Sequence, residues 1–214
     1  GDITGASLRG TWGEQNAFRG MAPGTVRDKG WFWLGTGRGQ VVQVILVESP
    51  IDTMSLAVLR KKNRLQSGAT IYLSVDGAGD IPKEALKGVI RNGGKVKVAF
   101  DADKAGELMA WRISQKLPRV ERLLPHYGKD WNEQLVGIKS STVNANRLDP
   151  LWRWYVAAQE MNHSEKYLRR ISEVTIAFHK GNPLSAKAKA AMAKDLKDSK
   201  AKRSRNREQS NTLS

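Results

Sequence analysis

The sequence predicts an α/β fold: a mostly parallel, four-stranded sheet of Rossmann-like type, flanked by helices and followed by a C-terminal helical extension. Three observations favour this fold class. Short apolar runs alternate with segments of helical periodicity between residues 41 and 124. Helix-start signals come directly after the apolar runs. Strands that alternate with helices of this length form parallel sheets with right-handed crossovers.

Residues 1–40 form a glycine-rich lead-in, in which we expect one or two short strands. The clearest strand covers 30–34 and contains Trp31, Phe32 and Trp33. The glycine-rich stretch 35–39 follows it and precedes the next strand. A dinucleotide-binding loop must follow a strand and open a helix, so 35–39 is interpreted as a turn.

Four core strands are expected, at 41–47, 69–75, 95–100 and 120–124. The first is apolar except at Gln43, as a strand with two buried faces should be. Ser49 is a predicted N-cap, with Pro50 at the first helical position and Asp52 at the capping-box position. Further helices are expected from Pro82 to the glycine pair at 93–94 and over 104–117.

The second half of the sequence changes character after the last core strand. Residues 126–147 look irregular, apart from a helical turn near 131–135, so the core domain is expected to span 41–136. A helical extension is predicted over 148–198, with helices at 151–161, 165–178 and 184–197. Residues 199–214 are polar and basic, with Leu213 as the one large apolar residue, and a disordered tail is expected there.

The composition points to a polyanionic partner. The chain of 214 residues carries a formal net charge of +15 and has a pI of about 10.2. Such charge favours nucleic acid, the alternative being a tail that only solubilises. The absence of cysteine excludes disulfides, thiolate zinc sites and cysteine nucleophiles in this sequence. No apolar run approaches the roughly 18 residues of a membrane span.

These features, with no visible signal peptide, lead us to expect a cytoplasmic protein without a membrane partner. The sequence begins at Gly1 in the middle of a pattern. We therefore expect other domains of a larger polypeptide beside it.

Carboxylates stand where two of the predicted strands end. Glu48 ends the first core strand, and Asp101 and Asp103 follow the third. Buried carboxylates are costly unless something pairs with them, and a divalent cation is a natural partner. Adjacent strands lie about 4.8 Å apart, so Glu48 and Asp101 would approach a common ion if their strands are neighbours. The pattern predicts a magnesium site for phosphate chemistry.

Several residues around this site keep two interpretations. Asp103 is a metal ligand, a helix N-cap, or both. Asp76 stands at another strand end, where it forms an Asp-Gly turn with Gly77 or serves as a secondary acid. Lys104 is a solvated first-turn lysine or a phosphate-binding group.

The residues around the acids carry a resemblance to a known family. Val-Glu48-Ser-Pro-Ile-Asp-Thr-Met-Ser-Leu, Ser74-Val-Asp-Gly and Phe-Asp101-Ala-Asp-Lys-Ala-Gly106 resemble the Toprim domain over about 41–125. That domain is shared by bacterial-type primases, type IA and II topoisomerases, some nucleases and recombination proteins. The Asp-x-Asp-x-Ala-Gly form and the segment 128–132 resemble primase-like members. Segments 4–10 and 18–24 resemble the lead-in of Toprim proteins from plasmids and other mobile elements.

The resemblance implies roles for individual residues. Asp101 and Asp103 would hold Mg²⁺, or Mn²⁺ in its place, and Glu48 would act as general acid or base or help to bind a second ion. Asp130 would be an outer acid near the substrate. The remaining roles are phosphate or nucleic-acid binding and backbone turns. The expected phosphate or nucleic-acid contacts are Lys104, Lys129, Lys202, Arg203, Arg205 and Arg207, and the turn residues are Gly77 and Gly106.

Together these features indicate the Mg²⁺-dependent catalytic fragment of a primase-like nucleotidyltransferase, acting with nucleotides on DNA or RNA in mobile-element replication or transfer. Two alternatives remain open. One is a Toprim nuclease or a topoisomerase-like nicking protein, although no sequence context marks a tyrosine nucleophile. The other is a non-catalytic nucleic-acid-binding module, against which the intact set Glu48, Asp101 and Asp103 argues. The sequence contains no Walker A loop.

Overall fold

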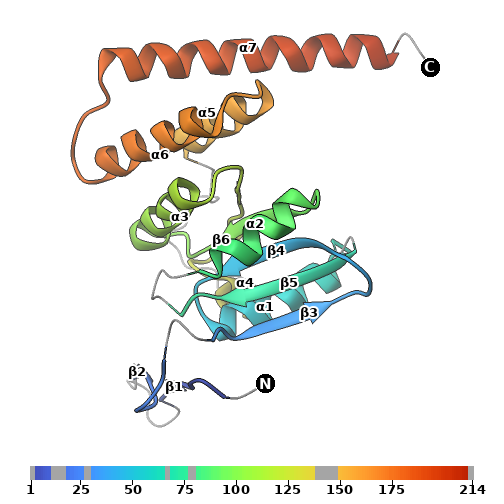
Figure 1. Ribbon diagram of the computed structural model, residues 1–214, viewed down its shortest axis with the longest axis vertical. Coiled ribbons are helices and arrows are strands. Elements are labelled where there is room, and N and C mark those ends of the chain that lie inside the picture. The colour runs from blue at the N-terminus through green and yellow to red at the C-terminus, as the bar shows by residue number, and fades with distance from the viewer. Residues whose placement is uncertain are drawn as a thin grey trace.

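The computed structural model describes residues 3–10, 18–26, 30–65, 68–76, 81–137 and 149–211. Its centre is a five-stranded sheet with the strand order β3-β5-β4-β6-β7 (Figure 1). The strands are β3 (Trp33–Thr36), β4 (Val41–Val47), β5 (Ala69–Ser74), β6 (Lys95–Ala99) and β7 (Glu121–Arg122). The last four run parallel, whereas β3 pairs antiparallel with β5. The predicted fold class is confirmed. The strand expected at 30–34 is β3, which begins at Trp33, takes up Gly35 and Thr36 of the predicted turn, and joins the four core strands at the edge of the sheet.

Helices cover both faces of the sheet. They are α1 (Pro50–Lys62), α2 (Lys83–Arg91), α3 (Lys104–Lys116) and α4 (Trp131–Val136). Alternate residues of β4 face opposite sides, as the period of a strand requires. Ile45 and Val47 pack in one buried cluster with residues of α1 and α4, while Val44 and Leu46 pack in the other with residues of α2 and α3. The continuous apolar run that predicted this strand therefore reflects burial on both faces.

Polar side chains at or near the carboxyl ends of the strands cap three helices. The Ser49 hydroxyl accepts a hydrogen bond from the Asp52 amide at 3.2 Å at the start of α1. Asp103 accepts one from the Gly106 amide at 2.8 Å at the start of α3. Asp130 caps α4 in the same way. Because Ser49 and Asp103 directly follow β4 and β6, α1 and α3 point their N-termini toward the same edge of the sheet, and the hydrogen bond from the Ala102 amide to the Lys129 carbonyl brings the start of α4 beside them.

A helical layer follows the sheet and packs on α3. It consists of α5 (Pro150–Glu160), α6 (Glu165–His179) and α7 (Ala186–Asn211) (Figure 1). The rings of Trp111 in α3 and Trp152 in α5 stack with centroids 3.7 Å apart, and Tyr155 meets both rings edge-on. The apolar core is therefore continuous from the sheet through α3 into the extension.

The helix α7 is longer than the sequence predicts. Residues 199–211 continue it, so the prediction of a disordered tail is wrong over this range, and 212–214 lie outside the described residues. The side chains of Ser199 and Arg203 both contact the Glu160 carboxylate at the end of α5. Alanine, lysine and arginine are also strong helix formers. The contacts with Glu160 and the high helix propensity of these residues together explain why 199–211 are helical without large apolar residues.

The N-terminal part forms a small separate sheet. β1 (Ser7–Arg9) pairs antiparallel with β2 (Arg19–Met21), and this hairpin lies beside the start of β3, at the opposite end of the molecule from α7 (Figure 1). Within the described ranges, no helix is long and apolar enough to cross a membrane.

Candidate active site

The strand order brings Glu48 and Asp101 to neighbouring positions. β4 and β6 are paired in parallel, with Val47 opposite Ala99 at their carboxyl ends. Glu48 follows β4 directly, and Asp101 follows β6 by two residues. Asp101 is 7% exposed, and its backbone amide hydrogen-bonds to the Glu48 carboxylate. The condition that the sequence left open, adjacency of the first and third core strands, is met.

Two oxygens of this pair have no hydrogen-bond partner. Glu48 Oε2 and Asp101 Oδ1 are both buried and unpaired. A buried carboxylate oxygen without a partner costs free energy because it loses its hydration without replacement. Carboxylate oxygens are the donors that Mg²⁺ and Mn²⁺ take. The donor set therefore fits a hard divalent cation.

The carboxyls also titrate abnormally. Burial raises the pKa of Asp101 to about 7, and repulsion from Glu48 and Asp52 adds to the effect. Burial likewise raises the pKa of Glu48, and the charge of Asp103 acts in the same direction. Without a cation, these groups therefore resist being charged together.

Lys129 bridges the two aspartates after β6. Its Nζ atom lies 3.4 Å from Asp101 Oδ2 and 3.1 Å from Asp103 Oδ2. Burial alone would raise the pKa of Asp103, but hydrogen bonds from Gly106 and Lys129 lower it. The Lys129 carbonyl also accepts a hydrogen bond from the Ala102 amide at 2.7 Å, which ties the two loops together. The lysine thus brings a positive charge to the acidic edge.

The sequence analysis missed Asp52 as a member of this acidic group. Asp52 is buried, and its carboxylate accepts hydrogen bonds from the Ser49 hydroxyl and from the Asn132 amide at 3.1 Å. Burial raises its pKa, and the charge of Asp130 adds to this. The sequence analysis assigned Asp52 to a capping box and therefore did not count it among the acids of the site. The available signal was a second acid four residues after Glu48, within the first turn of the helix that follows.

Gly106 of α3 and the side chain of Arg122 hold the turn that carries Asp101. A Cβ atom at Gly106 would lie 2.4 Å from the Asp101 carbonyl oxygen, so α3 can approach the turn only with glycine there. The buried Arg122 guanidinium donates hydrogen bonds to the carbonyls of Phe100 at 2.8 Å and Asp101 at 2.9 Å. Its Nε atom lies 3.2 Å from Glu107 Oε2, and the Trp152 indole donates to the other oxygen of Glu107. We call this chain of contacts from α5 to the turn the Arg122 bridge.

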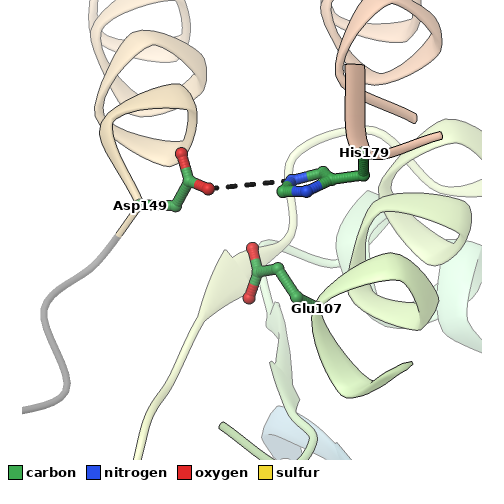
Figure 2. A group of neighbouring side chains, drawn as sticks. All are labelled: Glu107, Asp149 and His179. Carbon is green, nitrogen blue, oxygen red and sulfur yellow. Dashed lines mark ion pairs between the residues drawn. The ribbon is translucent and has the colours of Figure 1, made fainter. Parts of the chain in front are cut away.

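A second group of potential ligands lies elsewhere. Figure 2 shows Glu107, Asp149 and His179 converging from α3, the start of α5 and the end of α6, with their ligand atoms within 4.8 Å of one another. His179 Nε2 lies 3.7 Å from Asp149 Oδ2. Because Glu107 already pairs with a buried arginine, a cation here would face an adjacent positive charge. This group is distinct from the predicted magnesium ligands.

The remaining predicted residues are spread over the molecule. Asp76 ends β5 in a left-handed conformation with φ of 46° and accepts a hydrogen bond from the Ser7 hydroxyl at 2.7 Å. Lys104 is exposed at the start of α3, and Gly77 lies outside the described residues. Lys202 and Arg203 contact Glu160 on the helical layer. Arg205 and Arg207 are exposed on α7, so the structure does not bring these four basic residues to the acids.

Comparison with known proteins identifies the central segment. Residues 45–135 match the model of the Toprim-like family, from within β4 to within α4. The matched segment contains Glu48, Asp101, Asp103 and Asp130, and also Asp52 and Lys129. The chain has no match among curated proteins and none among solved structures.

Proposed function

We propose that residues 45–135, a Toprim-like domain, are the Mg²⁺-dependent catalytic part of a primase-like nucleotidyltransferase that acts on DNA or RNA. The observation that carries this proposal is the pair of buried, unpartnered oxygens on Glu48 and Asp101 at neighbouring strand ends. A structural ion pair would leave neither oxygen without a partner. A site that receives a cation and a phosphate group requires such oxygens.

The residues divide the work by their surroundings. Asp101 and Asp103 would hold Mg²⁺ or Mn²⁺, which when bound neutralises charge on phosphate oxygens. Glu48 accepts or returns the proton of the attacking hydroxyl, a task that suits a carboxyl whose pKa burial has raised. Lys129 would contact the phosphate through its positive charge. Asp130 caps α4 and would lie outside the metal ligands.

Further features support the finer parts of the proposal. The net charge of +15 offsets the repulsion between an acidic site and a polyanion. The Asp101-x-Asp-x-Ala-Gly106 form and the segment 128–132 resemble primase-like relatives. The lead-in at 4–10 and 18–24 resembles mobile-element proteins, which would place the chain in the cytoplasm beside other domains of a replication or transfer protein.

The test combines two assays on the same protein. Primer synthesis from ribonucleotides on single-stranded DNA is measured beside nicking of supercoiled plasmid, each with Mg²⁺ and with EDTA. Glu48→Gln should lower turnover at least 100-fold, the size of a lost general acid or base, while leaving nucleic-acid affinity within about twofold. Glu84→Gln makes the same chemical change on an exposed side chain of α2 and is the matched control.

The outcomes separate the candidates. Metal-dependent primer synthesis that Glu48→Gln abolishes supports the proposal. Nicking without synthesis, with the same dependence on Glu48, identifies a Toprim nuclease or nicking protein. Nucleic-acid binding with no activity in either assay identifies a non-catalytic binding module.

A further inference from the structure

A cavity of about 730 Å³ lies between the N-terminal hairpin and the carboxyl end of β5. Its size is within the range of about 300–1,000 Å³ that small-molecule sites occupy. Three consecutive aromatic residues, Trp31, Phe32 and Trp33, line it where the chain enters β3. Neither the magnesium proposal nor the fold requires a hollow at this place.

Two of the three aromatic residues are open to solvent, whereas Trp31 is partly buried against the core. Trp33 is 61% exposed and Phe32 is 39% exposed, although both belong to an element of the central sheet or its direct lead-in. A main-chain hydrogen bond of 2.9 Å from the Ser74 amide to the Phe32 carbonyl fixes the backbone that carries them. Large aromatic faces that are both fixed and exposed are suited to stacking against a planar group.

One end of the cavity is acidic. Asp76 lines it in a left-handed backbone conformation, and the Ser7 hydroxyl of the hairpin donates to its carboxylate at 2.7 Å. A carboxylate accepts hydrogen bonds from ring and exocyclic N–H groups of a base but repels a phosphate. The chemistry of the walls therefore fits a nucleobase, with its phosphate directed out of the cavity.

The cavity shares a wall with the acidic site. Pro50, two residues after Glu48, lines it, as does Ser74, whose hydroxyl donates to the Glu48 carbonyl at 3.5 Å. The amide of Val75, another lining residue, donates to Val47 at the end of β4. Arg9 of the hairpin is close enough to Asp52 to act on its charge. A phosphate leaving the cavity on this side meets both basic and metal-binding groups.

From these observations we infer that the cavity binds the base of a nucleotide unit, stacked on the Trp31–Trp33 aromatic wall, with Asp76 accepting from its N–H edge. The inference rests on the proposed function, whose substrate it describes. The unit is either a free nucleoside triphosphate or one nucleotide of a single strand, and the two share this recognition chemistry.

Equilibrium binding tests the inference without any turnover. The quench of tryptophan fluorescence and the anisotropy of a labelled probe are measured with the four ribonucleoside triphosphates and, separately, with a 12-nucleotide single strand. Trp33→Ala should weaken binding of one probe class about tenfold, the size of one lost base–aromatic stack, and Trp33→Phe should restore most of it. Phe178→Ala removes an exposed aromatic from the far helical layer and should change nothing.

A second measurement avoids substitution altogether. Probes that carry 5-iodouracil are cross-linked to the unaltered chain by light, and the adduct is mapped by mass spectrometry to the peptide with Trp31–Trp33. If Trp33→Ala loses affinity only for the triphosphates, the occupant is the free nucleotide. If it loses affinity only for the 12-nucleotide strand, the occupant is the strand. Unchanged affinity of Trp33→Ala for both probes, with adducts elsewhere, overturns the inference. Because Glu48→Gln should retain binding but lose turnover, a failure of the proposed function would appear in primer synthesis and a failure of this inference in binding.

Discussion

Two regions of the molecule bury carboxylates, and they treat them in opposite ways. Asp195 of α7 is 3% exposed and accepts hydrogen bonds from the Trp154 indole at 2.8 Å and the Tyr167 hydroxyl at 2.7 Å, with His163 Nε2 3.0 Å from its other oxygen. Asp101 is buried and Glu48 half-buried at the sheet edge, and each has one buried oxygen without any partner. The first carboxylate joins helices, whereas the second pair leaves bonding capacity unused.

The difference separates an acid whose oxygens are hydrogen-bonded from acids that keep an oxygen open to a ligand. A carboxylate that accepts from several donors stabilises the charged form and the helices that supply the donors. Neighbouring carboxylates whose oxygens are only partly hydrogen-bonded oppose each other's charge until a cation or proton binds. Burial alone therefore does not distinguish the two groups of acids, whereas the number of hydrogen-bonded oxygens does.

The largest expected effect is on stability and has opposite signs in the two regions. Asp195→Ala leaves the Trp154 and Tyr167 donors unpaired and should lower the free energy of unfolding by about 3 kcal/mol. Asp101→Asn should raise it by about 1 kcal/mol in EDTA at pH 8, because it removes a charge that burial and Glu48 oppose. Urea denaturation measures both, and Asp198→Ala, one turn further along α7, is the control. A loss of stability in Asp101→Asn would contradict the contrast.

The pH dependence of stability sharpens the contrast. The raised pKa of Asp101 means that the folded state holds its proton more tightly than the unfolded state. Stability in EDTA should therefore fall as pH rises from about 4 to about 7, by roughly 3 kcal/mol over that range. The slope attributable to this group is the difference between the unaltered chain and Asp101→Asn in urea denaturation at pH 4.5 and 8. Parallel pH profiles for the two proteins would exclude Asp101 as its source.

Metal should act on one region only. At pH 8, Mg²⁺ at ten times its dissociation constant should stabilise the unaltered chain by about 1.4 kcal/mol, since binding to the folded state alone shifts the unfolding equilibrium. Asp101→Asn should lose this gain, and Asp195→Asn should keep it. Thermal melts with Mg²⁺ and EDTA give the comparison, and an equal gain in both variants would place the ion elsewhere.

The smallest expected effect concerns the end of α7. Removing residues 204–214 deletes Arg205 and Arg207 but keeps Ser199 and Arg203 on Glu160. The salt dependence of nucleic-acid binding should flatten by about two counterions if these arginines contact phosphate. Stability should change by less than about 0.5 kcal/mol. Anisotropy titrations at several salt concentrations measure the slope, and an unchanged slope would show that the helix end does not touch nucleic acid.

Much of the sheet could be predicted because its signals are local. The apolar run at β4, the cap at Ser49 and the glycines after α2 each occupy a few adjacent residues. The ends of the apolar runs likewise predicted that Glu48 and Asp101 lie at strand ends. Their adjacency remained conditional, because the order of strands depends on pairing between β4 and β6 across some fifty residues.

The support of the site could not be predicted because its contacts are long-range. Arg122 reaches Asp101 from 21 residues away, and Trp152 reaches Glu107 from 45 away. Nothing in the local sequence of either residue marks such a partner. Asp52 was hidden for a different reason, since its position fits a helix cap as well as an active-site acid. At α7, composition predicted disorder while contacts with Glu160 hold a helix.

The Arg122 bridge extends beyond the segment that matches the family. The family match ends at residue 135, yet Trp152, which lies beyond that boundary, donates a hydrogen bond to Glu107 within it. A shorter ancestor or engineered piece ending there would expose the Trp111 ring and leave Glu107 without its indole donor. The segment that matches the family and the apolar core that supports it therefore end at different residues, because the core continues through α3 into α5.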